Sequence, residues 1–191
     1  TESIWLEDYK NSDYEKTQLF ILKKNENENA FRDFENLILS NKDCSKINFI
    51  YSKFTNVDFK NSNVSTCILT GATFKRCNLE ETIVAGSRIW ECKFIDCSMR
   101  NSNFAYINYE EEISERQISS SLFNNIVFEN CDLTGSDMSN ANFTGAIFKN
   151  CLLNNCNFDG STLYKVTMEK IYKDSEMLVL TEKQKGDCLW I

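Results

Sequence analysis

The sequence predicts an all-β solenoid, a rod of short stacked turns of chain, because three kinds of residue recur together every five positions. The first is a large apolar residue at the centre of each repeat, and it recurs through two blocks of the chain. Self-similarity at a fixed period is the signature of repeat architectures. The centres are Phe49, Phe54, Phe59, Val64, Leu69, Phe74, Leu79, Val84, Ile89, Phe94, Met99, Phe104 and Tyr109, and then Phe128, Leu133, Met138, Phe143, Phe148, Leu153, Phe158, Leu163 and Met168.

The other two kinds of residue flank each centre. A small residue stands two positions before most centres, and glycine, asparagine or aspartate is favoured two positions after them. Glycine and asparagine adopt turn and left-handed backbone at low cost, so they indicate a corner in every repeat. A period of five fits neither a helix, at about 3.6 residues, nor a flat strand, at about two. Each repeat therefore points a small and a large side chain inward, and the repeats must stack to bury them.

Two stretches carry a family resemblance. CILTGATFKRCNLEET and CDLTGSDMSNANFTGAIFKNCLLNNCNFDGSTL resemble the A(D/N)Lxx motif of the pentapeptide-repeat family, and the likeness covers residues 47–170. The resemblance implies a right-handed quadrilateral β-helix with four pentapeptides in each coil, so residues four repeats apart should stack. The rise per coil should then equal the spacing of neighbouring strands, about 4.8 Å. Twenty-two repeats would make about 5.5 coils and a rod roughly 26 Å long.

The nine cysteines are predicted to be core residues rather than disulfides or metal ligands. The N-terminus lacks the basic-then-apolar pattern of a signal peptide, and disulfide frameworks belong to oxidising compartments. No Cys-x-x-Cys spacing occurs, and no histidine could complete a mixed zinc site. Seven of the nine occupy the small position, where a free thiol fills space like a small apolar side chain. The stacking rule places Cys77 under Cys97 and Cys131 under Cys151.

Charge and composition narrow the functional class. The net charge of −7 argues against general binding to nucleic acid or acidic membranes, and no run of about 18 apolar residues could span a bilayer. No histidine, nucleophile elbow, phosphate-binding glycine loop or metal spacing is present, so neither catalysis nor a cofactor is expected. A composition rich in Asn, Lys, Ile, Ser and Phe, without an export signal, indicates a bacterial cytoplasmic protein.

The chain divides into an N-terminal segment, 1–44, a coil, 45–170, and a C-terminal segment, 171–191. The ends of a stacked coil expose core and free strand edges, so both are expected to carry short helical caps. Within the first segment, 29–40 is predicted to be a capping helix with an asparagine N-cap and four apolar residues on one face. The cap is Asn29 and the face is Phe31, Phe34, Leu37 and Ile38.

Two further segments are predicted to interrupt or end the coil. Phe128 falls one position short of where four further repeats after Tyr109 would place a centre, so residues 110–120 are expected to leave the coil as a loop. Residues 174–185 have a helical pattern and precede the apolar tail Cys188-Leu-Trp-Ile. Such a C-terminus resembles the dimerising end of the topoisomerase-protecting members of the family. The alternative is a cap that only folds back on its own coil.

Two functional hypotheses follow for a non-enzymatic, protein-binding rod. The family resemblance implies a DNA mimic, an acidic rod that binds DNA gyrase or topoisomerase IV and protects it from quinolones or toxins. The alternative is an interaction scaffold or effector with a different protein partner. Residues 45–109 carry a net charge of +3, which disfavours a mimic along that block. A continuous negative face on the folded rod would favour the mimic, and apolar or mixed faces would favour the scaffold.

The candidate contact residues fall in two groups, and exposed apolar residues among them indicate a partner surface. The first group combines the loop with an outward tryptophan that should stack in line with Ile50 and Thr70. Its members are Glu110, Glu111, Glu112, Glu115, Arg116 and Trp90. The second group is expected to make a homodimer contact or a cap, and its members are Met177, Leu178, Leu180, Leu189, Trp190 and Ile191. Packing beneath other segments of the chain is the alternative for the outward apolar residues, and a tolerated surface insertion is the alternative for the loop.

Overall fold

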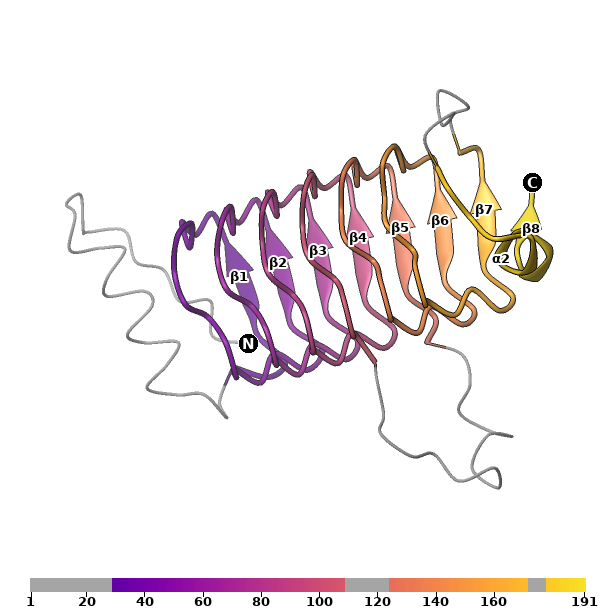
Figure 1. Cartoon of the computed structure of the whole chain (residues 1–191). Coiled ribbons are helices and arrows are strands. Elements are labelled where there is room, and N and C mark those ends of the chain that lie inside the picture. The colour runs from indigo at the N-terminus through magenta and orange to yellow at the C-terminus, as the bar shows by residue number, and fades with distance from the viewer. Residues whose placement is uncertain (1–28, 109–123, 172–177) are drawn as a thin grey trace, which may run out of the picture.

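The computed structural model describes residues 29–108, 124–171 and 178–191. One face is a single parallel sheet whose strands follow one another in chain order (Figure 1). The strands are β1 (Asp33–Glu35), β2 (Lys53–Thr55), β3 (Thr73–Lys75), β4 (Lys93–Ile95), β5 (Val127–Glu129), β6 (Ile147–Lys149), β7 (Thr167–Glu169) and β8 (Leu189–Trp190). Phe34 pairs with Phe54 and Phe54 with Phe74, so one coil takes four pentapeptides. The predicted all-β, right-handed quadrilateral β-helix is confirmed.

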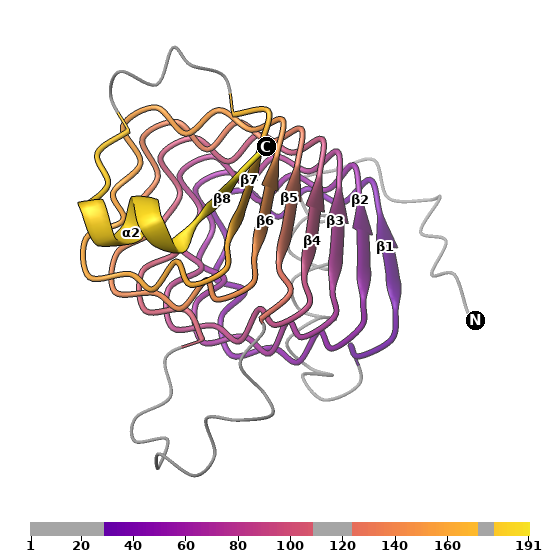
Figure 2. The same cartoon turned by 90° about the vertical axis from the view of Figure 1, so that its right-hand side faces the viewer.

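The other sides of each coil are held by isolated bridges rather than by strands. Ile38 pairs with Asp58 and Asp43 with Asn63, each across one coil. Seen from the C-terminal end, the coils lie one behind another (Figure 2). Because each coil exchanges backbone hydrogen bonds with its neighbours, the sides of the described rod have no free sheet edge. Free edges are confined to its two ends.

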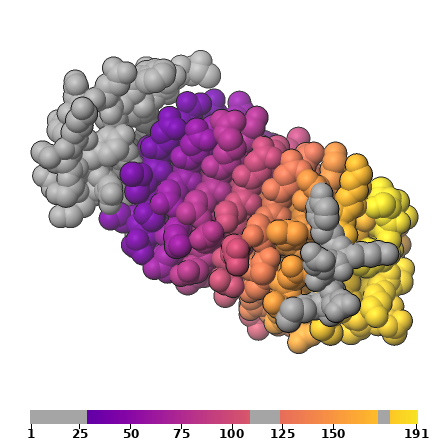
Figure 3. All heavy atoms as spheres, turned by 90° about the horizontal axis from the view of Figure 1, so that it is seen from above, coloured from indigo at the N-terminus to yellow at the C-terminus, as the bar shows by residue number. Residues whose placement is uncertain are grey.

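Stacked repeat centres fill the core. Six phenylalanines of the strand face lie ring over ring, with centroids 4.7–5.1 Å apart. They are Phe34, Phe54, Phe74, Phe94, Phe128 and Phe148. Rings from adjacent faces meet edge-on, as Phe49 does with Phe54 at 5.1 Å and 81°. Each such pair contributes about 0.5–1.5 kcal/mol beyond its burial. The space-filling view shows the described coils as one continuous rod (Figure 3).

Small residues lie between the large ones and hydrogen-bond to the preceding coil. The hydroxyls of Ser52, Thr82 and Ser87 donate to backbone oxygens of that coil at 2.7, 2.7 and 2.9 Å. The thiol of Cys92 does the same at 2.8 Å. A buried polar atom without a partner would cost about 1–3 kcal/mol, so the small position favours side chains that reach this oxygen.

Corners require left-handed backbone two positions after the centre, as the turn residues predict. Asn56 and Gly71 have φ of 54° and 69° there. The asparagine side chains then form ladders outside the coil. Asn56 Nδ2 donates to Asn36 Oδ1 at 3.2 Å, and Asn61 Nδ2 donates to Asn41 Oδ1 at 2.7 Å. These amide ladders tie neighbouring coils together on the surface.

The N-terminal capping helix predicted for 29–40 is wrong. This stretch contains β1 and forms the first coil, with Phe34 and Leu39 buried as repeat centres. The helical prediction was wrong because Phe31 and Ile38 have the three- and four-residue spacing from Phe34 that a buried helical face would have. In the structure their side chains are instead exposed, by 71% and 44%. Among the described residues the coil therefore extends back to residue 29 rather than starting at 45, and seven strands, β1–β7, each belong to a separate coil, against the expected total of 5.5 coils.

One coil contains an insertion. The register passes from Phe94 on β4 to Phe128 on β5, whereas the other steps between β1 and β7 take four pentapeptides each. The extra chain is one position short of three further repeats, and the described chain stops at Asn108 and resumes at Asn124. The core continues across the insertion, because the two phenylalanine rings are 5.1 Å apart. The loop predicted for 110–120 lies outside the described residues.

The C-terminal end is closed by α2 (Glu182–Asp187). Thr181 begins this helix in a capping box with Gln184. Gln184 is buried, and its Nε2 donates to the backbone oxygens of Phe158 and Ser161 at 2.8 and 3.1 Å. The helix thus satisfies carbonyls that a further coil would otherwise have bonded.

The tail after α2 extends the sheet by one strand. The N–H groups of Leu189 and Ile191 donate to the preceding coil at 2.7 and 3.1 Å, which forms β8. A helix is therefore present in the C-terminal segment, at 182–187 rather than the predicted 174–185, and residues 172–177 lie outside the described part. In the described ranges no helix has the length and apolar character needed to cross a membrane.

Candidate interaction surfaces

The charge of the described coils is balanced. Residues 29–108 carry ten bases and eight acids, and residues 124–171 carry three bases and five acids, so the two blocks differ in sign and cancel. Residues 178–191 add two of each. The whole chain nevertheless has a net charge of −7, so its acid excess comes entirely from the other segments. Acids do not accumulate along the described coils.

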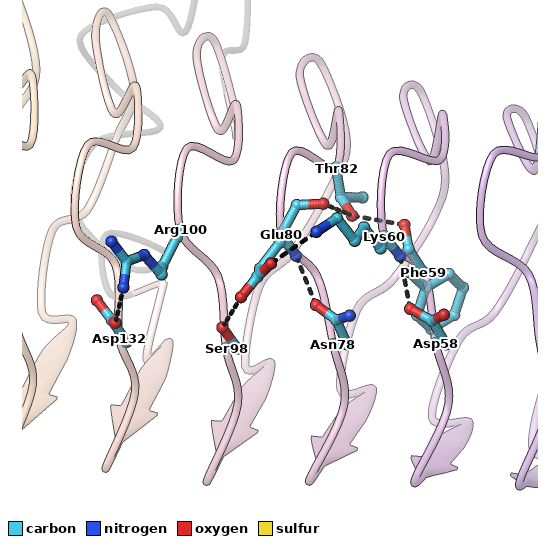
Figure 4. A network of polar contacts seen from close by, with 9 residues as sticks. All are labelled: Asp58, Phe59, Lys60, Asn78, Glu80, Thr82, Ser98, Arg100 and Asp132. Carbon is cyan, nitrogen blue, oxygen red and sulfur yellow. Dashed lines mark hydrogen bonds and ion pairs between the residues drawn. The ribbon is translucent and has the colours of Figure 1, made fainter.

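On one side of the rod, ion pairs run from coil to coil (Figure 4). Glu80 accepts hydrogen bonds from Ser98 Oγ at 2.7 Å and from Lys60 Nζ at 3.1 Å. Arg100 pairs with Asp132 at 3.7 Å. The Ser98 and Lys60 donors hold the pKa of Glu80 below its ordinary value, and Glu80 raises the pKa of Lys60. The four charges of these two ion pairs are therefore neutralised within the rod.

Trp90 lies on another side of the rod, which we call the Trp90 face. The buried centres of this face are Phe49, Leu69, Ile89, Phe143 and Leu163. Backbone hydrogen bonds place Trp90 one coil from Thr70 and two coils from Ile50, as predicted. Its side chain is half-buried, and the indole Nε1 has no hydrogen-bond partner. The residues predicted to act with it, Glu110, Glu111, Glu112, Glu115 and Arg116, lie outside the described residues.

The insertion opens from the Trp90 face. Directly after Trp90, the N–H of Glu91 donates to the oxygen of Asn124, the first described residue beyond the insertion, at 2.6 Å. Asn108, the last described residue before it, accepts from Ile89 N–H through Oδ1 at 2.9 Å. Trp90 therefore lies beside the point where the chain re-enters the coil.

Sequence reasoning missed an aromatic corner, where the Trp90 face meets the strand face. Phe31 and Tyr51 stack there at 5.5 Å and 26°, and they are exposed by 71% and 50%. The Tyr51 ring lies over Gly71, where a Cβ would collide with ring carbons. Both aromatic residues adopt left-handed backbone, which costs about 1 kcal/mol each. An aromatic residue at a position that elsewhere favours glycine, asparagine or aspartate was the signal available in the sequence.

All nine cysteines are free thiols, and eight are buried. Burial raises the pKa of Cys67 to about 11 and that of Cys156 to about 12, so both stay protonated at neutral pH. One corner stacks four thiols a coil apart, and they are Cys77, Cys97, Cys131 and Cys151. Among the residues that the structure describes, no three metal-ligating side chains gather in a way that could hold an ion. The thiols act as core fillers.

Comparison with protein families agrees with this architecture. A family model of pentapeptide repeats (8 copies) matches residues 33–65 and 67–104, and another, pentapeptide repeats (9 copies), matches residues 119–169. Together they cover more than half of the sequence. The chain belongs to the pentapeptide-repeat family. The first match begins at residue 33, inside the stretch for which a helix was predicted, which agrees with the coil that the structure describes there.

Solved structures similar to this pentapeptide-repeat protein match it at low identity and with low TM-scores. Full-length QnrB1, a plasmid-mediated fluoroquinolone resistance protein, is 17% identical over 85% of this chain and 83% of its own, with a TM-score of 0.34. A trypsin-treated QnrB1 is 17% identical over 71% of this chain, which spans only 64% of that one, with a TM-score of 0.36. Rfr23 of the cyanobacterium Cyanothece 51142 is 17% identical over 76% and 93%, with a TM-score of 0.31. No curated protein matches the sequence.

The second group of predicted contact residues lies at the C-terminal end of this pentapeptide-repeat rod. Leu178 and Leu180 line a depression of about 250 Å³ together with Lys185 and Trp190. Leu180 is buried against the core, whereas three tail residues are exposed by 57%, 47% and 66%. These three are Leu189, Trp190 and Ile191. Met177 lies outside the described residues.

The tail also presents a short free sheet edge. Leu189 and Ile191 direct their N–H groups to the preceding coil. Because alternate residues of a strand direct their backbone groups to opposite sides, the N–H and C=O of Trp190 point away from the rod. The structure therefore places the predicted tail residues at the outer edge of the last strand.

Proposed function

We propose that this pentapeptide-repeat protein is a non-catalytic rod of the bacterial cytoplasm that binds another protein through its outer surface. The observation that carries the proposal is a solid core combined with exposed aromatic side chains. Repeat centres fill the described coils, while Phe31 and Tyr51 stand out from their side. Exposed aromatic residues are enriched at protein interfaces, where they supply much of the binding energy. The proposal requires neither a cofactor nor a metal.

A more specific form of the proposal names DNA gyrase or topoisomerase IV as the partner. The rod would act as a DNA mimic that protects the enzyme from quinolones or toxins, with residues 110–116 as a contact. The net charge of −7 and the single insertion support this form. A duplex mimic needs its acids along the coil, however, and the described coils carry equal numbers of acids and bases. We therefore favour the second form, a scaffold or effector with a different protein partner and no direct binding to nucleic acid or membranes.

Gyrase supercoiling with the purified full chain, with and without ciprofloxacin, separates the two forms. Rescue of the drugged enzyme, or dose-dependent inhibition without the drug, would support the mimic. No effect at micromolar protein would leave the scaffold. If the mimic is right, deletion of residues 110–120 should abolish protection while circular dichroism shows an intact β-helix, and a deletion variant that still protects would contradict the role of the loop.

The C-terminal end is the proposed homodimer contact. The outward backbone groups of Trp190 and the exposed side chains of Leu189 and Ile191 support a twofold contact in which two β8 edges meet. Light scattering should give twice the chain mass for the full chain and a single mass for Leu189→Glu/Ile191→Glu. A full chain that stays monomeric at high concentration would contradict the contact.

A further inference from the structure

The side of the rod can be recognised only through side chains. Coil-to-coil hydrogen bonds pair the backbone along the described faces, and free edges remain only at the ends. A partner segment that approaches the side cannot add to the sheet as a strand. It must satisfy its own backbone, which an α-helix does within itself. An α-helix is thus an element that can lie against the side of this rod with its backbone fully paired.

The aromatic corner is the most exposed apolar feature on the side of the coil. Phe31 is exposed by 71% and Tyr51 by 50%, and both rings occupy one row along the rod. Ile50 and Ile68 stand on the Trp90 face beside them and are partly exposed. Rows on the rod recur at about 4.8 Å, close to the helical pitch of about 5.4 Å. Apolar side chains three and four residues apart on a helix can therefore lie along this corner.

The rows on both sides of the corner each reach, in the fourth coil, a base that is unpaired among the described residues. The strand-face row next to it runs Asp33, Lys53, Thr73 and Lys93, one residue per coil. On the Trp90 face, the row that contains Ile68 continues to Arg88. Lys53 forms a 3.7 Å ion pair with Asp33, whereas Lys93 and Arg88 have no acidic partner in the described coils. A helix lying between these rows meets Lys93 on one flank and Arg88 on the other, and the exposed carboxylate of Glu91 stands between them in the corner row itself.

We infer that the aromatic corner is a docking site for an amphipathic helix of a partner protein that carries acidic residues along the flanks of its apolar stripe. This inference rests on the proposed protein-binding function and names the chemistry of the partner. The apolar stripe covers Phe31 and Tyr51, and its carboxylates pair with Lys93 and Arg88. Desolvated aromatic residues and arginine are typical of the residues that dominate binding energy at interfaces.

Two synthetic peptides test the inference on the full chain. Both are about 15 residues long, which is near the shortest length at which an isolated helix forms in water. Both carry leucine at positions i, i+3, i+4 and i+7, and the flanks carry glutamate in one peptide and lysine in the other. Fluorescence anisotropy should show saturable binding of the glutamate peptide, at least about tenfold tighter than that of the lysine peptide.

Substitution at the corner should remove this binding. Phe31→Ser/Tyr51→Ser should weaken binding of the glutamate peptide by about tenfold or more, because the apolar stripe then loses both rings. The matched control Ile83→Ser removes a residue exposed by 45% on a different side and should leave binding unchanged.

Charge reversal provides the second arm. Lys93→Glu/Arg88→Glu should invert the preference, so that the lysine peptide binds more tightly, and matching unfolding curves would show that the variants remain folded. Absence of saturable binding to either peptide, equal binding of both, or binding that survives Phe31→Ser/Tyr51→Ser would each overturn the inference. The peptide result does not depend on gyrase. A failed supercoiling assay with successful peptide binding would reject only the topoisomerase partner.

Discussion

The coils of residues 29–108 and those of residues 124–171 share one core but present different surfaces. Phenylalanine rings stack at nearly equal spacing in both blocks and across the insertion between them. The first block has two more bases than acids and places aromatic residues at several corners, whereas the second has two more acids than bases. Every coil must pack against its neighbours inside, so the centres stay large and apolar in both blocks. The outward residues are free of that constraint and differ between the two blocks.

Removing one ring of the shared core is the most severe way to test this comparison. Phe54→Ala in the first block and Phe128→Ala in the second should each lower the free energy of unfolding by about 3–5 kcal/mol, because both rings are fully buried between stacked neighbours. Urea unfolding should give a similar loss for both. Two separate transitions, one for each block, would show that the core is not shared.

The cap on the C-terminal end of the second block should be the next most sensitive feature. Gln184→Ala leaves the carbonyl oxygens of Phe158 and Ser161 without their donor, which should cost about 1–3 kcal/mol of unfolding free energy. The matched control is Lys183→Ala, an exposed neighbour on the same helix. Thermal unfolding measures both, and an equal loss in the two variants would remove the capping role of Gln184.

Gly71 tests the aromatic corner of the first block. Alanine at Gly71 or Gly86 must adopt left-handed backbone, which costs about 1 kcal/mol. A Cβ at Gly86 meets only an ordinary contact at 3.6 Å, whereas one at Gly71 collides with the Tyr51 ring. Gly71→Ala should therefore cost about 1 kcal/mol more than Gly86→Ala in urea unfolding, since it also displaces Tyr51. Equal losses would mean that Tyr51 does not rest on Gly71.

The ion pairs along the side of the rod should have the smallest effect. The pKa of Glu80 lies below 4.5 in the folded protein, so its stabilising contribution is present above that pH and is lost as the pH falls through the folded-state value. Glu80→Gln should remove this part of the acid sensitivity, about 0.5 kcal/mol for a partly exposed pair. The measurement is unfolding free energy between pH 6 and roughly pH 3. An unchanged pH profile in Glu80→Gln would show that these pairs contribute nothing.

Residues 31–38 show where local pattern fails. Phe31, Phe34 and Ile38 fit a helical face as well as they fit a pentapeptide, and only the stacking of Phe34 on Phe54 distinguishes the two. That contact spans a whole coil and has no local signal. The insertion shows the same limit, because the change in phase between the blocks defines its length only to within a multiple of five. The aromatic corner was missed because the turn positions were judged by the Gly, Asn and Asp residues that they favour. Phe31 and Tyr51 occupy two of these positions and are exceptions to that preference.

Sequence alone was enough to establish the repeat, the buried centres, the corners and the thiols of the core, because each of these depends on positions within one pentapeptide. It also placed Trp90 in line with Thr70 through the four-repeat rule. The tertiary structure added the contacts that depend on neighbours in space. These are the packing of the first coil, the stacking of Cys97 on Cys131 across the insertion, the hydrogen bonds by which Gln184 caps the last coil, and the stack of Phe31 on Tyr51. Such contacts join residues that lie a coil or more apart in the chain, and their energy comes from packing between coils rather than from the preference of any single residue.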